Sequence, residues 1–204
     1  MRARFALFAV ALPIFLLCPS TTSAVLRRSF VTSVQGTGDL FSWPGSSGAT
    51  ALERGDSICR ARATAGGLPN AATYRAWLST STVDAYCHVQ GLTGTRADAC
   101  HGASQPGGGP WYQWNGVTQF TADLATLTGP AHVIYRPVLF DEFGTLVGLA
   151  AGSYWTGTVS DGTVLSGGNC MDWMSASSGA LGLVGHGLGG SFTWTLVAGS
   201  GCID

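Results

Sequence analysis

Apolar and β-branched residues along the chain occur in short runs that glycine-rich segments interrupt. Such runs are typical of β-strands, and the Gly, Asn and Asp pairs between them are typical of turns. The strongest hairpin signal is Asn115-Gly116, which separates two runs rich in aromatic and polar residues. Asp161-Gly162 predicts a second turn. The expected strands lie at residues 27–34, 74–79, 109–120 (two strands around the hairpin turn), 131–140, 153–164 (two strands around the second turn) and 191–197.

One segment carries the signals of a helix. Residues 56–65 are rich in Ala and Arg, and their apolar positions recur at helical spacing, so one face can be buried. The sequence GGLP at 66–69 ends this helix. The tripeptide Arg-Gly-Asp at 54–56 matches an integrin-binding motif, but we interpret Asp56 as a favourable charge at the helix N-terminus. One or two helices among many short strands predict an α+β fold with the helix packed on antiparallel sheet.

The first residues have the layout of a secretory signal peptide. Two arginines precede the apolar run 5–17, and Ala24 ends a stretch of small residues of the kind that signal peptidase requires. The apolar run is shorter than the roughly 18 residues that a bilayer span needs. We therefore expect a cleaved leader at residues 1–24 and a single domain at residues 25–204, secreted or displayed on the cell surface. Lipid attachment at Cys18 is the alternative.

The charge of the chain is low and nearly balanced. Ten Arg residues, no Lys and eleven acids give a formal net charge of −1, and charged residues make up 10% of the sequence. No basic stripe is present, so we do not expect nucleic acid as a partner. No second stretch is apolar and long enough to cross a membrane, so we expect no transmembrane segment after cleavage of the leader.

Five cysteines follow the leader: Cys59, Cys87, Cys100, Cys170 and Cys202. Export makes disulfide bonds the default interpretation of these residues. An odd number leaves one thiol unpaired. No CxxC or histidine-rich spacing indicates a structural zinc site.

Seven short motifs occur in an order that matches a known family. The chain resembles a family of secreted bacterial domains with a C-type-lectin-like fold, related in architecture to endostatin and without an established biochemical function. The likeness spans residues 30–194 and implies a C-type-lectin-like α+β domain with long glycine-rich loops. The motifs are FVTS at 30–33, GDSICRARATAGGLP at 55–69, YRAWLSTSTVDA at 74–85, DEFGT at 141–145, WTGT at 155–158, DGT at 161–163 and GNCMDWMSASS at 168–178.

The segment at residues 86–109 is an addition relative to this family. Cys87 and Cys100 lie within it, and we expect them to pair and to clip the added loop.

The family pattern also bears on the other cysteines. It implies a disulfide between Cys170 and Cys202, which leaves Cys59 as a free thiol. A bond between Cys59 and Cys202, with Cys170 free, is the alternative. Family members continue into a final strand with a further cysteine beside residues 30–33, and its absence here predicts an exposed sheet edge that invites pairing with another chain.

Signals of catalysis and of metal binding are weak. None of the four histidines lies in a GxSxG elbow or an HExxH helix, so we predict that the protein is not an enzyme. The adjacent acids Asp141 and Glu142 are the basis of the alternative, a secreted hydrolase. Together with Asp161, Asn169 and Asp172 they supply oxygen ligands for calcium, but the sugar-binding triplets of calcium-dependent lectins are absent. We expect no cofactor, with calcium as the alternative.

Aromatic and polar residues in the second half are candidate ligand contacts. Trp111 and Trp114 cluster on the predicted hairpin, where exposed ring faces can stack on sugars or anchor a protein. The resemblance places Asn169, Asp172 and Trp173 where the ligand-reading loop of the fold lies. The candidate ligand-binding residues are therefore Trp111, Trp114, Asp141, Glu142, Asn169, Asp172 and Trp173.

These observations predict a secreted, disulfide-bonded, non-enzymatic binding module for a glycan or an extracellular protein. The alternatives are a hydrolase that uses Asp141 or Glu142 and a structural surface protein. We expect the latter to assemble through its exposed edge or through Cys59, with a homodimer as the candidate assembly.

Overall fold

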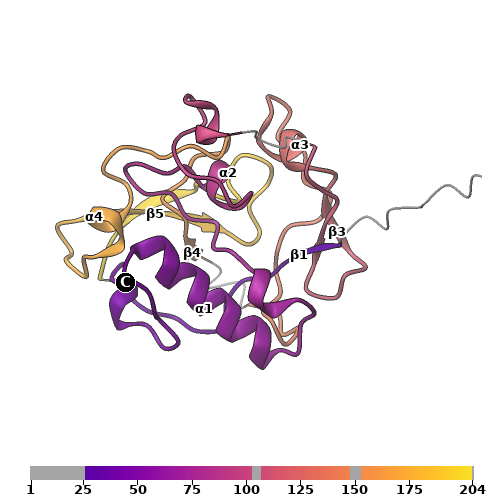
Figure 1. Ribbon diagram of the computed structural model, residues 1–204, viewed down its shortest axis with the longest axis horizontal. Helices are drawn as coiled ribbons and strands as arrows, with labels where there is room; N and C mark the ends of the chain where they lie inside the picture. Colours follow the sequence, from indigo (N-terminus) through magenta and orange to yellow (C-terminus); the bar gives the residue numbers. More distant parts are fainter. Residues whose placement is uncertain (1–25, 103–106, 148–152, 204) are drawn as a thin grey trace, which may run out of the picture.

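The computed structural model describes residues 26–102, 107–147 and 153–203 (Figure 1). The predicted leader and the lipid-attachment alternative at Cys18 lie outside the described residues. The fold within them is α+β, as predicted, and no described helix is long and apolar enough to cross a bilayer. The elements are β1 Arg27–Ser29, α1 Ala51–Ala65, α2 Ala85–His88, β2 Trp111–Gln113, β3 Gln119–Thr121, α3 Leu124–Thr128, β4 Ser153–Trp155, α4 Cys170–Trp173, β5 Leu181–His186 and β6 Ala198–Gly201, with short 3-10 turns at Leu40–Ser42, Ala71–Thr73 and Ala99–His101.

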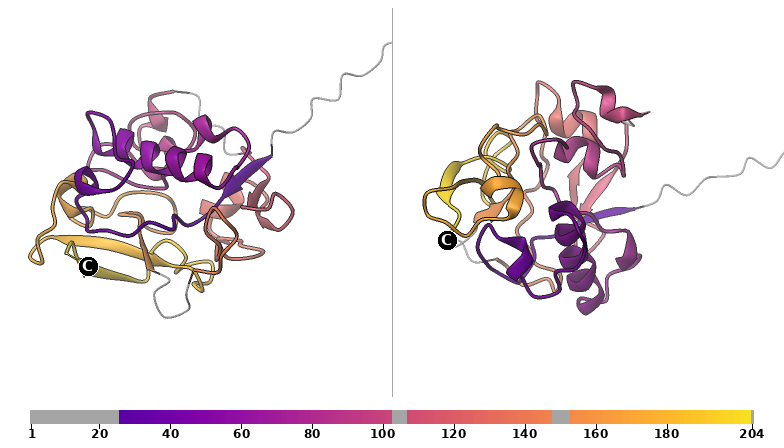
Figure 2. Two further views of the ribbon diagram at one scale, coloured as in Figure 1. Left: turned by 90° about the horizontal axis from the view of Figure 1, so that it is seen from below. Right: turned by 60° about the vertical axis from the view of Figure 1, so that its left-hand side comes forward.

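Two small sheets form the frame of the domain. In the first sheet β1 pairs in parallel with β2, which pairs antiparallel with β3. In the second sheet β4, β5 and β6 are antiparallel neighbours in that order. Strands β1 and β4 therefore each lie at an edge. Figure 2 shows α1 along one side of the molecule and β5 and β6 on the opposite side, with the extended residues 30–38 running between them.

Helix α1 begins at Ala51 rather than at the predicted Asp56. The hydroxyl of Thr50 accepts from the amide of Glu53, and the carboxylate of Glu53 accepts from the amide of Thr50, which forms a capping box. Asp56 therefore does not cap the helix. It lies in the second turn, is 4% exposed and bonds to the ring of His88 and to a backbone amide of the neighbouring segment. The Arg-Gly-Asp tripeptide is thus part of the helix packing.

Both predicted turns are confirmed. The side-chain oxygen of Asn115 accepts from the two amides that follow the turn, and Gly116 adopts the positive φ of 68° that such a hairpin turn requires. The carboxylate of Asp161 likewise accepts from the amide and hydroxyl of Thr163, and Gly162 has a φ of 86°. Short polar side chains beside glycine therefore indicated these turns correctly.

Several strand predictions are wrong in position. Strand β1 covers only the first three residues of the predicted run 27–34, because its partner β2 ends opposite Ser29, at Gln113. In the described part of the chain, no regular strand forms at residues 74–79, 131–140 and 191–197.

Strands β5 and β6 are not evident from the sequence because glycines occupy positions where side chains would show the period of two. These glycines are needed for close packing. A Cβ at Gly182 would lie 2.5 Å from the sulfur of Cys170, and one at Gly185 would lie 2.2 Å from the carbonyl oxygen of Trp194. Glycine within a strand marks such close approach.

Both predicted disulfides, Cys87–Cys100 and Cys170–Cys202, are present. Cys59 is the free cysteine of the described residues, so the alternative bond between Cys59 and Cys202 is wrong. Each disulfide belongs to a different cluster of buried residues, and the domain therefore has two cores.

The disulfide Cys170–Cys202 lies in the core that packs α1 against the second sheet. Both of its cysteines are fully buried. Gly38 packs against the Cys170 sulfur, as Gly182 does, since a Cβ at Gly38 would lie 2.2 Å from that sulfur. Backbone from two distant segments thus covers this disulfide directly.

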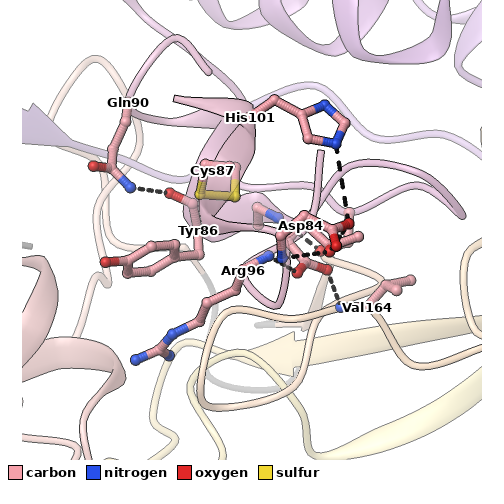
Figure 3. Close-up of a disulfide and its surroundings, with 12 residues drawn as sticks. Asp84, Tyr86, Cys87, Gln90, Arg96, His101 and Val164 are labelled. Carbon is pink, nitrogen blue, oxygen red and sulfur yellow. Dashed lines mark hydrogen bonds and ion pairs between the residues drawn. A yellow bond between two sulfur atoms is a disulfide. The ribbon is translucent and has the colours of Figure 1, made fainter. Parts of the chain in front are cut away.

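The disulfide Cys87–Cys100 closes the loop between these two cysteines (Figure 3). Asp84, which is 2% exposed, accepts from the amide of Arg96 at 2.7 Å and from the amide of Val164 at 2.8 Å. The guanidinium group of Arg96 lies 4.5 Å from the centre of the Tyr86 ring. The loop that this disulfide closes is therefore packed on the loop that contains the Asp161-Gly162 turn.

Loss of the Cys170–Cys202 disulfide is expected to lower the free energy of unfolding more than loss of Cys87–Cys100. The sequence separations of 32 and 13 residues correspond to about 4 and about 3 kcal/mol of loop entropy. Denaturant unfolding of the two double Cys→Ala variants measures this difference. A larger loss for the Cys87–Cys100 pair would contradict it.

Candidate functional site

Helix α4 is a left-handed turn. Its four residues, Cys170 to Trp173, have φ values of 50°, 55°, 54° and 62°. The amides of Trp173 and Met174 donate to the carbonyls of Asn169 and Cys170 at 2.8 and 3.2 Å. For L-residues the left-handed conformation costs roughly 1–2 kcal/mol each. Such strain persists only where the surroundings hold it, and it is most frequent at functional sites.

Three side chains of this region hold the turn in place. The carboxylate of Asp172 accepts from the amide and the hydroxyl of Ser81, both at 2.6 Å. Asn169 donates to the same carboxylate at 2.6 Å. Trp173 is fully buried, and its indole N–H donates to the carbonyl of Ser79 at 2.8 Å. The structure therefore brings these three predicted ligand residues together, but their polar atoms bond to the chain itself.

The acid pair Asp141-Glu142 forms a structural clamp. Glu142 is fully buried, with one oxygen paired to Arg62 and to the hydroxyl of Ser33, and the other accepting from the Ser33 amide at 3.0 Å. Asp141 is 7% exposed and accepts from two amides of its own turn, those of Phe143 and Thr145. Among the described residues, no histidine and no second carboxylate contacts either acid.

The predicted aromatic surface is covered in part by its own neighbours. Trp111 donates from its indole N–H to the carbonyl of Gly108 at 2.9 Å, and the guanidinium of Arg27 lies 5.7 Å from its ring centre. Trp114 packs on Gly144, where a Cβ would lie 2.4 Å from the indole. Both residues are half-buried, and Trp111 lines the cavity described next.

A cavity of about 680 Å³ lies between the two cores, and sequence reasoning did not identify it. The only signals that point to it are the unpaired Cys59 and the exposed edge expected beside residues 30–33, since both line it. Its walls come from α1, from both sheets and from the extended segment after β1. Representative lining residues are Phe30, Val34, Ile58, Cys59, Trp155 and Trp194.

The cavity has an apolar wall and a basic margin. Arg28 and Arg75 line it, and no acidic residue does so in the described part of the chain, although Arg75 is paired with the carboxylate of Asp56 at 3.6 Å. Burial raises the pKa of the Cys59 thiol to about 12, and the nearby carboxylate of Asp56 adds to this effect. The thiol is therefore protonated at neutral pH and is a poor nucleophile. Burial also raises the pKa of Tyr154.

The chain offers no preformed metal centre in the ranges that the structure describes, because no three His, Cys, Asp or Glu side chains gather there as a ligand set. No family model matches the chain, and no curated protein matches it in sequence. The C-type-lectin-like likeness therefore rests on the order of short motifs and stays a prediction.

Two exposed methionines test the strain in the left-handed turn. Met171 is 69% exposed with a φ of 55°, and Met174 is 62% exposed with a φ of −116°. We expect Met171→Gly to raise the free energy of unfolding by up to about 1 kcal/mol, because glycine adopts positive φ without strain. Met174→Gly should lower it by about 0.5–1 kcal/mol. Denaturant unfolding that shows the same sign for both variants would rule out the strain.

The clamp is tested by Glu142→Gln. This change leaves Arg62, whose side chain is 23% exposed, without its counter-charge and should lower the free energy of unfolding by about 3 kcal/mol. Glu53→Gln is the matched control. Glu53 is an exposed carboxylate on α1, the helix that carries Arg62, and its amide replacement still accepts a hydrogen bond. Thermal and denaturant unfolding compare the two variants. Equal effects would show that the Glu142 charge is not structural.

Proposed function

We propose that the protein is a secreted, non-enzymatic binding module with a C-type-lectin-like fold that recognises an extracellular protein through its central cavity. The observation that carries this proposal is the cavity itself. Protein interiors contain few voids larger than a water molecule, whereas ligand pockets have volumes of about 300–1,000 Å³. The cavity volume of about 680 Å³ lies within that range. Two disulfides are compatible with an extracellular location.

An apolar partner fits the cavity better than a glycan does. Sugar recognition needs convergent polar groups beside an open aromatic face. The polar atoms of Asn169 and Asp172 bond to each other and to Ser81. Trp173 is fully buried. The cavity instead presents residues such as Ile58 and Val34.

The hydrolase alternative finds less support. The oxygens of Asp141 and Glu142 already accept hydrogen bonds from the chain, and the described contacts supply no partner for acid–base chemistry. Calcium would have to displace the same donors. Both alternatives therefore require a rearrangement that the binding-module proposal does not.

The accessibility of the cavity is tested with an apolar fluorescent dye such as anilinonaphthalene sulfonate. Val34→Trp places extra volume in the cavity wall and should weaken dye binding at least tenfold. Val117→Trp is the control, because Val117 is 78% exposed and does not line the cavity. Fluorescence titration at one protein concentration measures the three dissociation constants.

Two results would contradict the proposal. The first is dye binding that Val34→Trp does not change, because the dye would then occupy another surface. The second is saturable binding to a glycan array that a chelator abolishes and that Val34→Trp leaves intact. That result would favour the alternative of a calcium-dependent glycan site outside the cavity.

A further inference from the structure

The two sheets present their edges to the same cavity. Strand β1 ends the first sheet and β4 ends the second, since each has a partner strand on one side. Ser29 of β1 and the β4 residues Ser153, Tyr154 and Trp155 all line the cavity. An edge strand carries unpaired backbone donors and acceptors, which form a template for another strand.

The extended segment after β1 continues this open edge. The amide of Val31 donates to the carbonyl of Phe140, and the amide of Ser33 donates to the carboxylate of Glu142. Successive amides of an extended chain point to opposite sides. On the other side, the amides of Thr32 and Val34 donate to no described residue.

The open side of this segment faces β4. Gly36 lies two residues after Val34, so its carbonyl points to the same side of the extended chain as the amides of Thr32 and Val34. This carbonyl accepts from the indole N–H of Trp155, a β4 residue, at 3.0 Å. Thr32, Val34 and Gly36 all line the cavity. Unpaired amides therefore border the space between the two sheet edges.

Other unpaired donors belong to the same cavity. The indole N–H of Trp194, a residue that is 5% exposed, and the Nε of Arg28 are buried without a hydrogen-bond acceptor in the described structure. Buried donors of this kind are costly and are normally satisfied. A purely apolar ligand would leave them unpaired, whereas a polypeptide strand supplies carbonyl oxygens along its length.

We infer that the cavity is the acceptor groove for an extended, apolar segment of a partner protein, which inserts between β1 and β4 and joins the two three-stranded sheets into one. This inference rests on the proposed function and specifies its ligand. Strand addition of this kind gains affinity from main-chain hydrogen bonds and specificity from alternate side chains. Arg28 lines the cavity and has no carboxylate partner among the described residues, so its charge favours a segment with an acidic residue at one end.

The source of the segment is another protein rather than a second copy of this chain. Insertion between two edges needs a strand that is free on both sides, and each described strand already has a partner on at least one side, so no described strand of a second copy meets this need. A fatty acid shares the apolar and acidic chemistry, but it offers no backbone to the amides of Thr32 and Val34. A second copy of the chain and a fatty acid are therefore each tested as competing occupants.

The first measurement is peptide binding. The probe is an acetylated peptide of about seven residues with valine at alternate positions, one terminal aspartate and one cysteine. Its control has the same side chains but N-methyl groups on alternate amides, which blocks pairing at the edge. We expect the first peptide to displace the cavity dye and to bind at least tenfold more tightly than the methylated control.

The second measurement uses Cys59 as a reporter of docking. The peptide cysteine is supplied as a mixed disulfide with an aromatic thiol. The Cys59 thiol first loses its proton to solvent, and its thiolate then attacks the peptide sulfur, so that a Cys59–peptide disulfide forms and the aromatic thiolate leaves. Docking raises the effective concentration of the peptide beside a thiol that is otherwise unreactive. Release of the aromatic thiol should be at least tenfold faster than with the methylated peptide, and Cys59→Ser should abolish it.

The remaining outcomes separate this inference from the proposed function. If the dye enters the cavity but the two peptides bind equally, or if oleate binds and the peptide does not, strand insertion is wrong and the cavity remains a binding site. If the purified chain dimerises and thereby blocks the peptide, the occupant is a second copy and the partner assignment is wrong. If neither dye nor peptide enters, both proposals fail.

Discussion

The buried carboxylate of Glu142 fixes the segment on which the centre of the molecule depends. It joins Arg62 of α1 to both the amide and the hydroxyl of Ser33, so it holds the helix, the chain after β1 and its own turn at one point. On one side of residues 31–33 both amides are bonded, that of Val31 to the Phe140 carbonyl and that of Ser33 to Glu142. The other side is left open toward β4, and the character of the cavity follows from this asymmetry.

The domain is divided into two cores that meet across this cavity. Each core contains a disulfide, one beside Trp173 and the other beside Tyr86. Residues that wall a cavity lose the dispersion contacts that a filled interior supplies. The disulfides offset this loss by restricting the unfolded chain, which allows a protein of this size to keep an unfilled centre.

The sequence predicted those features that local chemistry decides. Asn115-Gly116 and Asp161-Gly162 need particular backbone angles, and glycine next to a short polar residue indicates them directly. The predicted start of α1 was wrong. The sequence pattern placed the N-terminus at Asp56, whereas Thr50 and Glu53 cap the helix several residues earlier. Strands β5 and β6 were missed because tertiary packing against Cys170 and Trp194, not local preference, requires their glycines.

The same limit applies to the candidate site. Asn169 and Asp172 have the right chemistry for a ligand, but only the three-dimensional structure shows that Ser81 and the left-handed turn use that chemistry. The cavity leaves even less trace in the sequence, since its walls come from segments that are far apart along the chain. An unpaired cysteine was its one local sign.

The backbone that covers Cys170 has a kinetic consequence. Gly38 and Gly182 lie against the same sulfur, and both bonded cysteines have no exposed surface, so a thiol reductant has no line of approach in the folded state. Reduction then has to wait for the surrounding segments to separate. Where the reductant is concentrated enough to outpace reclosing, the lifetime of this bond equals the opening time of the fold; at lower concentrations it follows the population of the opened state.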